Sequence, residues 1–509
     1  MAHSIWKGLG DGSLSNIDKL EKINQPHFAW GYFFMMTFPE QDTIVAISSP
    51  VGRGAIACIR ISGRNANIAV AQLLESNKEI EKLSSRTLHL VWLLNKEGQR
   101  LDQVTLARFL APHSYTGEDL IEIFCHGGKW VPTLIVENLC RAGCRLAEAG
   151  EFTRRAFFNH KLDLIQAEAV EDIIAAESPA GLQNALQHLE GHFSGRMRQL
   201  RQRLLHTCAL LELGLDFSEE DVEFADRAQL QNELVGLEKE ISFLLVSFQR
   251  GQALKDGWRV AIIGKPNVGK SSLMNMLLRQ DRVIVSSIAG TTRDTVEDSF
   301  MLDGQRFRLI DTAGIRPDLP LKASKESRGR DEIESQGIAR SRRAAEEAHI
   351  ILFVSDQSQP PDAHDEAILA ECSRFANDSA GKKIIHIRNK NDLSKSANAV
   401  RLPFAVTAEL ETSAITGAGI SELEKTLCAA TNDSDRSGEV VLTNLRHKQC
   451  LEKALIALHN AKQSLNENLS AEFVAADLRE VIHQIGVLVG EATAEDILGE
   501  IFSNFCIGK

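Results

Sequence analysis

Short strand-like runs dominate the first third of the chain, and long helical patterns replace them further on. Residues 43–48, 55–61, 104–110 and 120–124 have the β-rich composition of strands, and 131–141 has the period of a helix. From 163 to 249, and again from 442 to 505, apolar residues recur at helical spacing with little Gly or Pro. Short apolar runs typical of buried strands lie between these stretches, at 260–263, 307–310 and 384–387.

This order predicts a multidomain protein. We expect an α+β domain at 42–155, an all-α helical domain in two parts at 156–257 and 433–509, and an α/β domain inserted between them at 258–432. Because both flanks of the insert are helical, we expect them to pack together as one body. Residues 1–41 differ in pattern from the rest, which predicts a disordered extension or a start codon upstream of the natural one.

Composition narrows the class of protein. The 509 residues carry a formal net charge of −12 and the pI is about 5.7, so contact with nucleic acid would require a local basic patch. Nine cysteines without a Cys-x-x-Cys pair indicate a reduced, cytoplasmic protein without a zinc ribbon. No apolar run is long enough to span a membrane. The densest basic stretch is spread around a helix, so we expect a solvated face; it consists of Arg196, Arg198, Arg201 and Arg203.

The strongest chemical signal is a phosphate-binding loop. Its sequence is Gly264-Lys265-Pro266-Asn267-Val268-Gly269-Lys270-Ser271, after an apolar run and before a helical pattern. In such a loop the glycines let backbone N–H groups surround the β-phosphate. We expect Lys270 to neutralise oxygens of the β- and γ-phosphates and the Ser271 hydroxyl to ligate Mg²⁺.

A second motif indicates that the nucleotide is GTP. The sequence Asn389-Lys390-Asn391-Asp392 follows the apolar run at 384–387. The Asp392 carboxylate can accept hydrogen bonds from N1–H and N2–H₂ of guanine, donors that adenine does not present in this arrangement. We expect Asn389 and Lys390 to brace this loop and pack against the base. Residues 412–414 are predicted to form the last loop that contacts guanine.

Two more segments fit the moving parts of a GTP hydrolase. Asp311 would hold Mg²⁺ through water, and the N–H of Gly314 would face the γ-phosphate. Residues 290–294 fit switch I, in which Thr292 completes the Mg²⁺ shell. Ile315 stands where many GTPases have a glutamine, so another group must orient the attacking water. The residues expected to bind GTP are Asn267, Val268, Gly269, Lys270, Ser271, Ser272, Ser286, Ser287, Ile288, Ala289, Gly290, Thr291, Thr292, Asp311, Thr312, Ala313, Gly314, Asn389, Lys390, Asp392, Ser413 and Ala414.

The motifs, their helical flanks and the final Phe505-Cys506-Ile507-Gly508-Lys509 together resemble the MnmE (TrmE) family of tRNA modification GTPases. The resemblance runs from about residue 42 to 509 and includes Gly-Arg-Gly at 52–54, Ile-Arg-Ile-Ser-Gly at 59–63, Tyr-Thr-Gly-Glu-Asp at 115–119, His-Gly-Gly at 126–128, Gly-Glu-Phe at 150–152 and Lys-Leu-Asp-Leu at 161–164. It implies an α+β folate-binding domain, a helical domain and an inserted P-loop α/β (Ras-like) GTPase domain.

The resemblance also implies an activity with partners. A homodimer would join an FAD-containing partner, MnmG, in a heterotetramer or larger assembly. Together they would add an aminomethyl or carboxymethylaminomethyl group to C5 of the wobble uridine of certain tRNAs. G-domain dimerisation and hydrolysis would be stimulated by K⁺, which replaces an arginine finger. The matching K⁺ donors are Asn267, Ser286, Ile288 and Thr291. Glu334 is nominated to orient the water, although 317–330, before it, is longer than the family pattern.

The one-carbon unit would come from a folate, 5-formyl- or 5,10-methylene-tetrahydrofolate. The positions that match the family's folate contacts are Arg60, Glu122, Lys161 and Lys509. Two roles remain open for Cys506. Its thiolate could capture the one-carbon unit or a uridine adduct, or it could pack near the folate while the flavin partner supplies all redox chemistry.

Two other classes are alternatives. A ribosome-assembly GTPase of the Era or EngA kind shares the P-loop, switch I and Asn-Lys-x-Asp signals. Such a protein would carry a basic RNA-binding module or a second GTPase copy, and the sequence shows neither. A nucleotide-gated scaffold would dimerise without covalent chemistry. Neither alternative predicts folate binding, which therefore separates both from the MnmE family.

Overall fold

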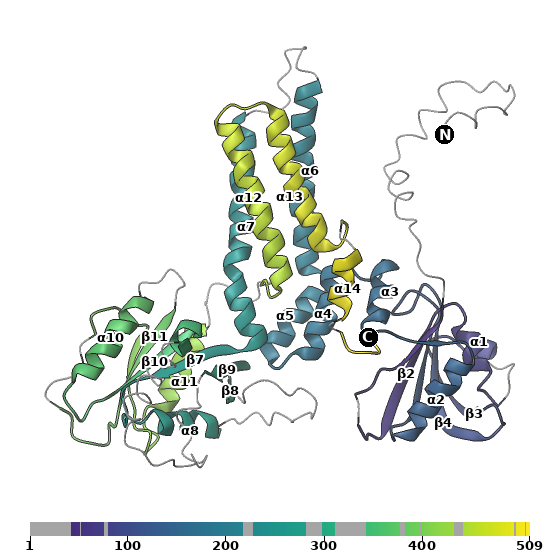
Figure 1. Ribbon diagram of the computed structural model, residues 1–509, viewed down its shortest axis with the longest axis horizontal. Helices are drawn as coiled ribbons and strands as arrows, with labels where there is room; N and C mark the ends of the chain where they lie inside the picture. Colours follow the sequence, from purple (N-terminus) through teal and green to yellow (C-terminus); the bar gives the residue numbers. More distant parts are fainter. Residues whose placement is uncertain are drawn as a thin grey trace, which may run out of the picture. The chain divides into compact units, whose positions relative to one another are not determined.

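The computed structural model describes residues 42–50, 52–75, 80–216, 227–280, 298–310, 343–376, 382–396, 400, 402–431, 441–492, 495–503 and 505–509. The chain forms two compact units (Figure 1): residues up to Lys161 together with Phe502–Lys509, and Leu162–Ile501. The C-terminal segment thus belongs to the N-terminal unit, although its sequence pattern predicted a place in the helical domain. The contacts explain this, because Ile507 pairs with Ala149 and the Ser48 hydroxyl donates to the Gly508 carbonyl (3.1 Å).

The first unit is an α+β domain built on one sheet. Within the described residues its strand order is β3 (Leu88–Leu94), β4 (Arg100–Phe109), β5 (Leu120–His126), β2 (Ile56–Ser62), β1 (Ile44–Ile47) and β6 (Arg145–Leu146). Neighbouring strands are antiparallel except β1 and β6. Because side chains alternate between faces, Ile59, Ile61 and Ile121 line one buried face. The helical elements are α1 (Ala66–Ala71), a short 3₁₀ helix (Ile80–Lys82), α2 (Trp130–Arg141) and α3 (Glu151–Phe158).

The helical part of the second unit is a bundle. Its long helices are α6 (His192–Asp216), α7 (Arg227–Asp256), α12 (Leu445–Asn466) and α13 (Ala471–Val489), and the shorter α4 (Leu164–Ala175), α5 (Pro179–Leu189) and α14 (Glu495–Ser503) accompany them. On α7 the buried side chains recur every three or four residues, which turns one apolar stripe toward the core. That core unites residues before and after the inserted domain, so the two helical flanks do pack together.

A buried polar cluster fixes the point where the chain returns from the inserted domain. The Glu168 carboxylate on α4 accepts two hydrogen bonds from Arg446 (both 2.8 Å) and one from His447 (2.6 Å). Burial alone would raise the pKa of Glu168, but His447 and Arg446 outweigh it and bring this pKa to about 2. Close to this point a Cβ on Gly251 would lie 2.0 Å from the Leu442 carbonyl oxygen, so only glycine fits there.

The inserted domain contains a mostly parallel sheet. Its strand order within the described residues is β12 (Ala408–Glu411), β11 (Lys383–Asn389), β10 (Ile350–Asp356), β7 (Trp258–Ile263), β9 (Gln305–Leu309) and β8 (Ser299–Leu302), with only β8 and β9 antiparallel. The helices are α8 (Lys270–Gln280), α10 (Ala363–Ala376) and α11 (Ile420–Thr431). Loops that follow parallel strands gather at the carboxyl edge of a sheet, which is where such folds bind ligands. In the described part of the chain, no helix is long and apolar enough to cross a membrane.

Candidate functional site

The phosphate-binding loop joins the end of β7 to the start of α8, as the sequence predicted. Gly264 and Gly269 have φ of +156° and +97°, a region that favours glycine. A Cβ on Gly264 would lie 2.3 Å from the Val354 carbonyl oxygen, and one on Gly269 would lie 2.2 Å from Asn389 Nδ2. The close contacts at both positions therefore require glycine.

Lys270 stands at the first position of α8. Its ammonium donates to the carbonyls of Gly264 (2.6 Å) and Lys265 (2.8 Å), and burial lowers the pKa of Lys270. A phosphate brought to this loop would supply the negative charge that the buried ammonium lacks. Ser271 follows directly on the same helix, and Asn267 has a φ of +64° within the loop. The residues present therefore fit a nucleotide phosphate.

The second motif lies directly against this loop. Asn389 is 1 % exposed, and its Nδ2 donates to the Val268 carbonyl (2.7 Å). Its Oδ1 accepts from the Ala414 N–H (3.1 Å) and the Thr412 hydroxyl (3.2 Å). One amide thus links the phosphate loop to the loop at 412–414. The link places Asn389 where the sequence predicted a brace.

Asp392 and Lys390 are each held by a polar partner. Asp392 Oδ1 accepts a hydrogen bond from the Ser413 hydroxyl (2.5 Å), and its carboxylate is exposed. Lys390 pairs with the buried Asp356 at 2.7 Å. Burial would raise the pKa of Asp356, but hydrogen bonds from Lys390 and Ser358 hold it below its usual value. The ordered carboxylate of Asp392 is suited to accept paired N–H donors from a purine edge.

Lys265 has a bracing contact that the motif did not reveal. Its ammonium pairs with Asp365 (2.8 Å) and Asp362 (3.2 Å) at the start of α10. Desolvation works against the charge on Lys265, but the two carboxylates outweigh it and raise the pKa of Lys265. The partners lie almost a hundred residues downstream, so no local pattern could have indicated them.

Several predicted residues lie outside the described part of the chain. They are Ser286, Ser287, Ile288, Ala289, Gly290, Thr291, Thr292, Asp311, Thr312, Ala313, Gly314 and Glu334. The water-orienting role of Glu334, the K⁺ donors of switch I and the Mg²⁺ ligand Thr292 therefore stay predictions.

All four residues predicted to contact folate belong to the first unit, and three of them lie close together there. Arg60 on β2 pairs across the sheet with Glu122 on β5, and its Nε and Nη2 donate to Glu122 Oε1 (3.0 and 2.8 Å). Burial lowers the pKa of Lys509, and the nearby charge of Arg60 lowers it further. Arg60 Nη1 is buried without a hydrogen-bond partner among the described residues, so this donor is unsatisfied in the described structure. The aromatic rings of Tyr115 and Phe152 enclose the same guanidinium.

Lys161 and Cys506 differ in their contacts from Arg60, Glu122 and Lys509. The Lys161 ammonium donates to the Pro112 carbonyl (3.0 Å), and no hydrogen bond among the described residues joins it to Arg60, Glu122 or Lys509. Cys506 is exposed, and its carbonyl accepts from the Lys509 N–H (3.3 Å). Cys506 is therefore not buried in the core, unlike Cys125.

The densest basic stretch is neutralised by acidic side chains of the same unit. Each of its four arginines has an acidic partner: Arg196 pairs with Glu240, Arg198 with Asp163, Arg201 with Glu491, and Arg203 with Glu233 and Glu240. Such pairs leave little free charge to attract an RNA phosphate.

Comparisons with known proteins agree with these observations. A family model of the MnmE helical domain matches residues 164–506, and a model of the GTP-binding protein TrmE N-terminus matches residues 43–161. The tRNA modification GTPase MnmE of Flavobacterium johnsoniae is 41% identical over 480 residues, which cover 92% of this chain and 99% of the relative. The protein of the same name from Christiangramia forsetii is 41% identical over 487 residues, with 92% and 99% covered. A solved structure of Era from Aquifex aeolicus, bound to GDP and aluminium fluoride, is 28% identical to this chain. The match covers 39% of this chain and 65% of the Era chain, and its TM-score of 0.24 is too low to bear on the fold.

Proposed function

Because this chain belongs to the MnmE family of tRNA modification GTPases, we propose that it hydrolyses GTP in order to modify the wobble uridine of certain tRNAs. Nucleotide binding is supported by the hydrogen bonds of the Asn389 side chain, which join the phosphate loop to the loop at 412–414. A nucleotide with phosphates at the first loop and its base at the second would span both. The relatives' function does not favour a ribosome-assembly role.

Hydrolysis would use the charged groups at the phosphate end. Ser271, with Thr292, would hold Mg²⁺, and Asn267, Ser286, Ile288 and Thr291 would hold K⁺. Hard oxygen donors suit both ions, and bound cations stabilise charge that develops on the phosphates. Lys270 would keep the β- and γ-phosphates in place, and Glu334 would orient the attacking water. These roles come to this chain from the family motif, residue by residue.

The modification chemistry would begin in the first unit. Arg60 and Lys509 would contact the acidic tail or an acceptor of a tetrahydrofolate. Nη1 of Arg60, which has no hydrogen-bond partner among the described residues, supports such a role. Glu122 can accept N–H bonds from a pterin ring. A folate bound there would supply the one-carbon unit, and a flavoprotein partner of the MnmG kind would supply the redox chemistry. The exposure of Cys506 leaves it accessible as a nucleophile, so both roles predicted for it can be tested.

The base specificity can be tested by inverting one hydrogen-bonding group. The Asp392→Asn variant replaces an acceptor by an amide that can donate to the C2 oxygen of xanthine. We expect it to lose affinity for GTP and to gain affinity for xanthosine triphosphate, measured by competition with a fluorescent nucleotide. Hydrolysis by the parent should be faster in K⁺ than in Na⁺ at equal ionic strength. If the variant retains the parent's affinity for GTP, Asp392 does not read the base.

A further inference from the structure

Two turns meet at one end of the sheet in the first unit, and neither is used by the functions described above. One is the loop at 52–55 before β2, and the other is the segment at 126–130, which joins β5 to α2. The Gly54 N–H donates to the Gly127 carbonyl (3.0 Å), and the Gly127 N–H donates to the Ala55 carbonyl (3.1 Å). A Cβ on Gly127 would lie 2.6 Å from the Gly54 carbonyl oxygen, so the close contact needs a glycine. These contacts hold the backbones of the two turns together, so the exposed side chains of both turns belong to one surface.

His126 in this surface is held by a buried carboxylate. Its Nδ1 lies 2.7 Å from Asp102 Oδ1, and its backbone N–H donates to Asp102 Oδ2 (2.9 Å). The Asp102 side chain is 10% exposed, whereas that of His126 is 74% exposed. With Nδ1 occupied by the carboxylate, Nε2 is left to bond a ligand. The buried Asp102 carboxylate thus fixes the position of the imidazole in this surface.

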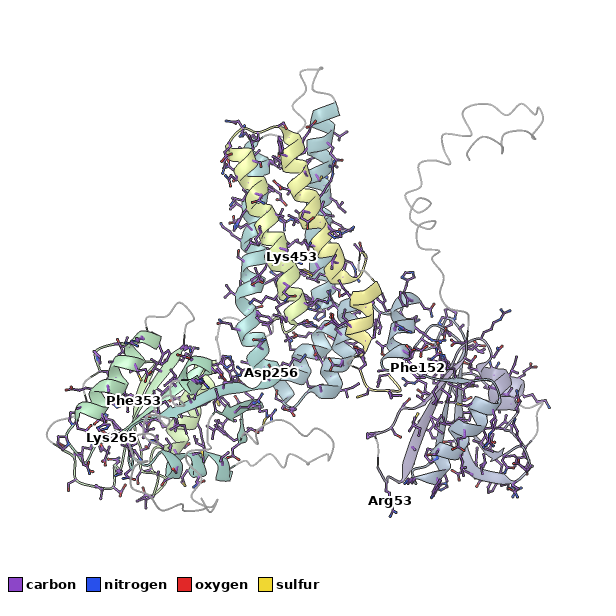
Figure 2. The ribbon with its side chains drawn as sticks, viewed as in Figure 1. Arg53, Phe152, Asp256, Lys265, Phe353 and Lys453 are labelled. Atoms are coloured by element: carbon purple, nitrogen blue, oxygen red, sulfur yellow. The ribbon has the colours of Figure 1, made fainter. Side chains whose placement is uncertain are left out.

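Apart from Ala55, the remaining exposed side chains of this surface are cationic or aromatic. Arg53 and Lys129 are exposed, and neither has an ion-pair partner among the described residues. Trp130 is 69% exposed, and the Lys129 ammonium lies 5.9 Å from the centre of its ring. Figure 2 shows the Arg53 side chain at the outer edge of the first unit. The unit as a whole contains more Lys and Arg than Asp and Glu, although the chain carries a net charge of −12.

Register connects this surface to the predicted folate contacts. In the pairing of β2 with β5, Arg60 faces Glu122 and Ile56 faces His126. Residues four apart on a strand share a face and are separated by about 13 Å. The His126 side chain and the Arg60–Glu122 pair therefore lie on one face of the sheet. An RNA bound at His126 would have bases near the predicted one-carbon donor.

We propose that Arg53, His126, Lys129 and Trp130 form an RNA-binding surface that holds tRNA beside the one-carbon site. The proposal rests on the proposed function and names the part of the chain that contacts the substrate. Two cations suit phosphates, and an exposed indole can stack on an unpaired base. His126 Nε2 can bond a base edge or a 2′-hydroxyl. The neutralised arginines at 196–203 offer no comparable surface.

The test compares binding of an unmodified tRNA transcript to the full-length chain and its variants, with and without the flavoprotein partner, over a series of salt concentrations. Arg53→Gln with Lys129→Gln should weaken binding and lower the slope of log K against log salt by about one to two. Trp130→Ala should weaken binding roughly 5- to 150-fold with an unchanged slope. Lys82→Gln with Lys96→Gln removes the same charge from exposed positions of the same unit and should bind like the parent. GTP hydrolysis and the melting temperature should not change in any of these variants.

Each other outcome has a definite meaning. If the parent binds the transcript and all three variants bind it equally well, this surface does not contact RNA, while the proposed function stands. The surface is equally excluded as an RNA site if the variants lose only their binding to the flavoprotein. If the parent does not bind the transcript under either condition, both the surface and the proposed tRNA substrate are wrong.

Discussion

Asn389 is the residue whose loss should reveal how the nucleotide site is held together. In Asn389→Ala the Val268 carbonyl and the Ala414 N–H each lose a buried partner. An unsatisfied buried polar group costs about 1–3 kcal/mol, so the two together cost about 2–6 kcal/mol. If the loops move locally and admit water, the cost lies at the lower end of this range. A loss of about 2 kcal/mol in the nucleotide-bound state corresponds to roughly 30-fold weaker binding.

The assay is displacement of a fluorescent guanine nucleotide from the full-length chain, together with thermal unfolding. Asn391→Ala is the matched control, because the Asn391 side chain is exposed and its backbone N–H, which donates to the Thr412 carbonyl (3.0 Å), is retained in alanine. We expect the control to bind nucleotide like the parent. If Asn389→Ala binds within about threefold of the control, a difference of less than about 0.7 kcal/mol, the bridge does not support the site.

Three other predictions concern separate parts of the chain. Arg60→Gln should abolish measurable binding of 5-formyl-tetrahydrofolate in a calorimeter while GTP hydrolysis continues, and unchanged folate affinity would remove Arg60 from the site. Gly251→Ala should destabilise the helical bundle by more than about 2 kcal/mol in urea unfolding, because the added Cβ meets the Leu442 carbonyl, whereas Gly195→Ala has open space and should be neutral or stabilising. Glu168 has a pKa of about 2 in the folded chain, whereas its ordinary value is 4.5. Its contribution to the free energy of unfolding is therefore present above pH 4.5 and is lost as the pH falls toward 2. In Glu168→Gln the free energy of unfolding should not fall in this way between pH 4.5 and 2. If its pH dependence runs parallel to that of the parent, the ionised Glu168 does not stabilise the fold.

The nucleotide site could be predicted from the sequence because its chemistry is local. Gly264, Lys270 and Asn389 occupy motifs in which spacing along the chain fixes their position in space. The order of strand-like and helical patterns likewise indicated a helical body interrupted by an α/β domain. Both predictions use information contained within a few tens of residues.

Contacts between distant segments could not be predicted in this way. The Lys265–Asp365 pair joins positions 100 residues apart, and the packing of the C-terminal segment on the first unit joins Ile507 to Ala149. No periodic pattern indicates either contact, and the motifs that contain Lys265 and Ile507 do not identify their partners. Arg60 and Glu122 could be named as folate contacts only through family resemblance, and their pairing depends on the register between β2 and β5.

The central claim is that GTP hydrolysis by this chain serves tRNA modification. The most direct measurement is mass spectrometry of tRNA nucleosides from cells that lack the chain, complemented either by the parent or by Lys270→Ala. We expect 5-aminomethyl-type wobble uridines to disappear with the deletion and to return with the parent but not with Lys270→Ala. Nucleosides unchanged by the deletion would contradict the claim, and full restoration by Lys270→Ala would show that modification does not need the nucleotide site.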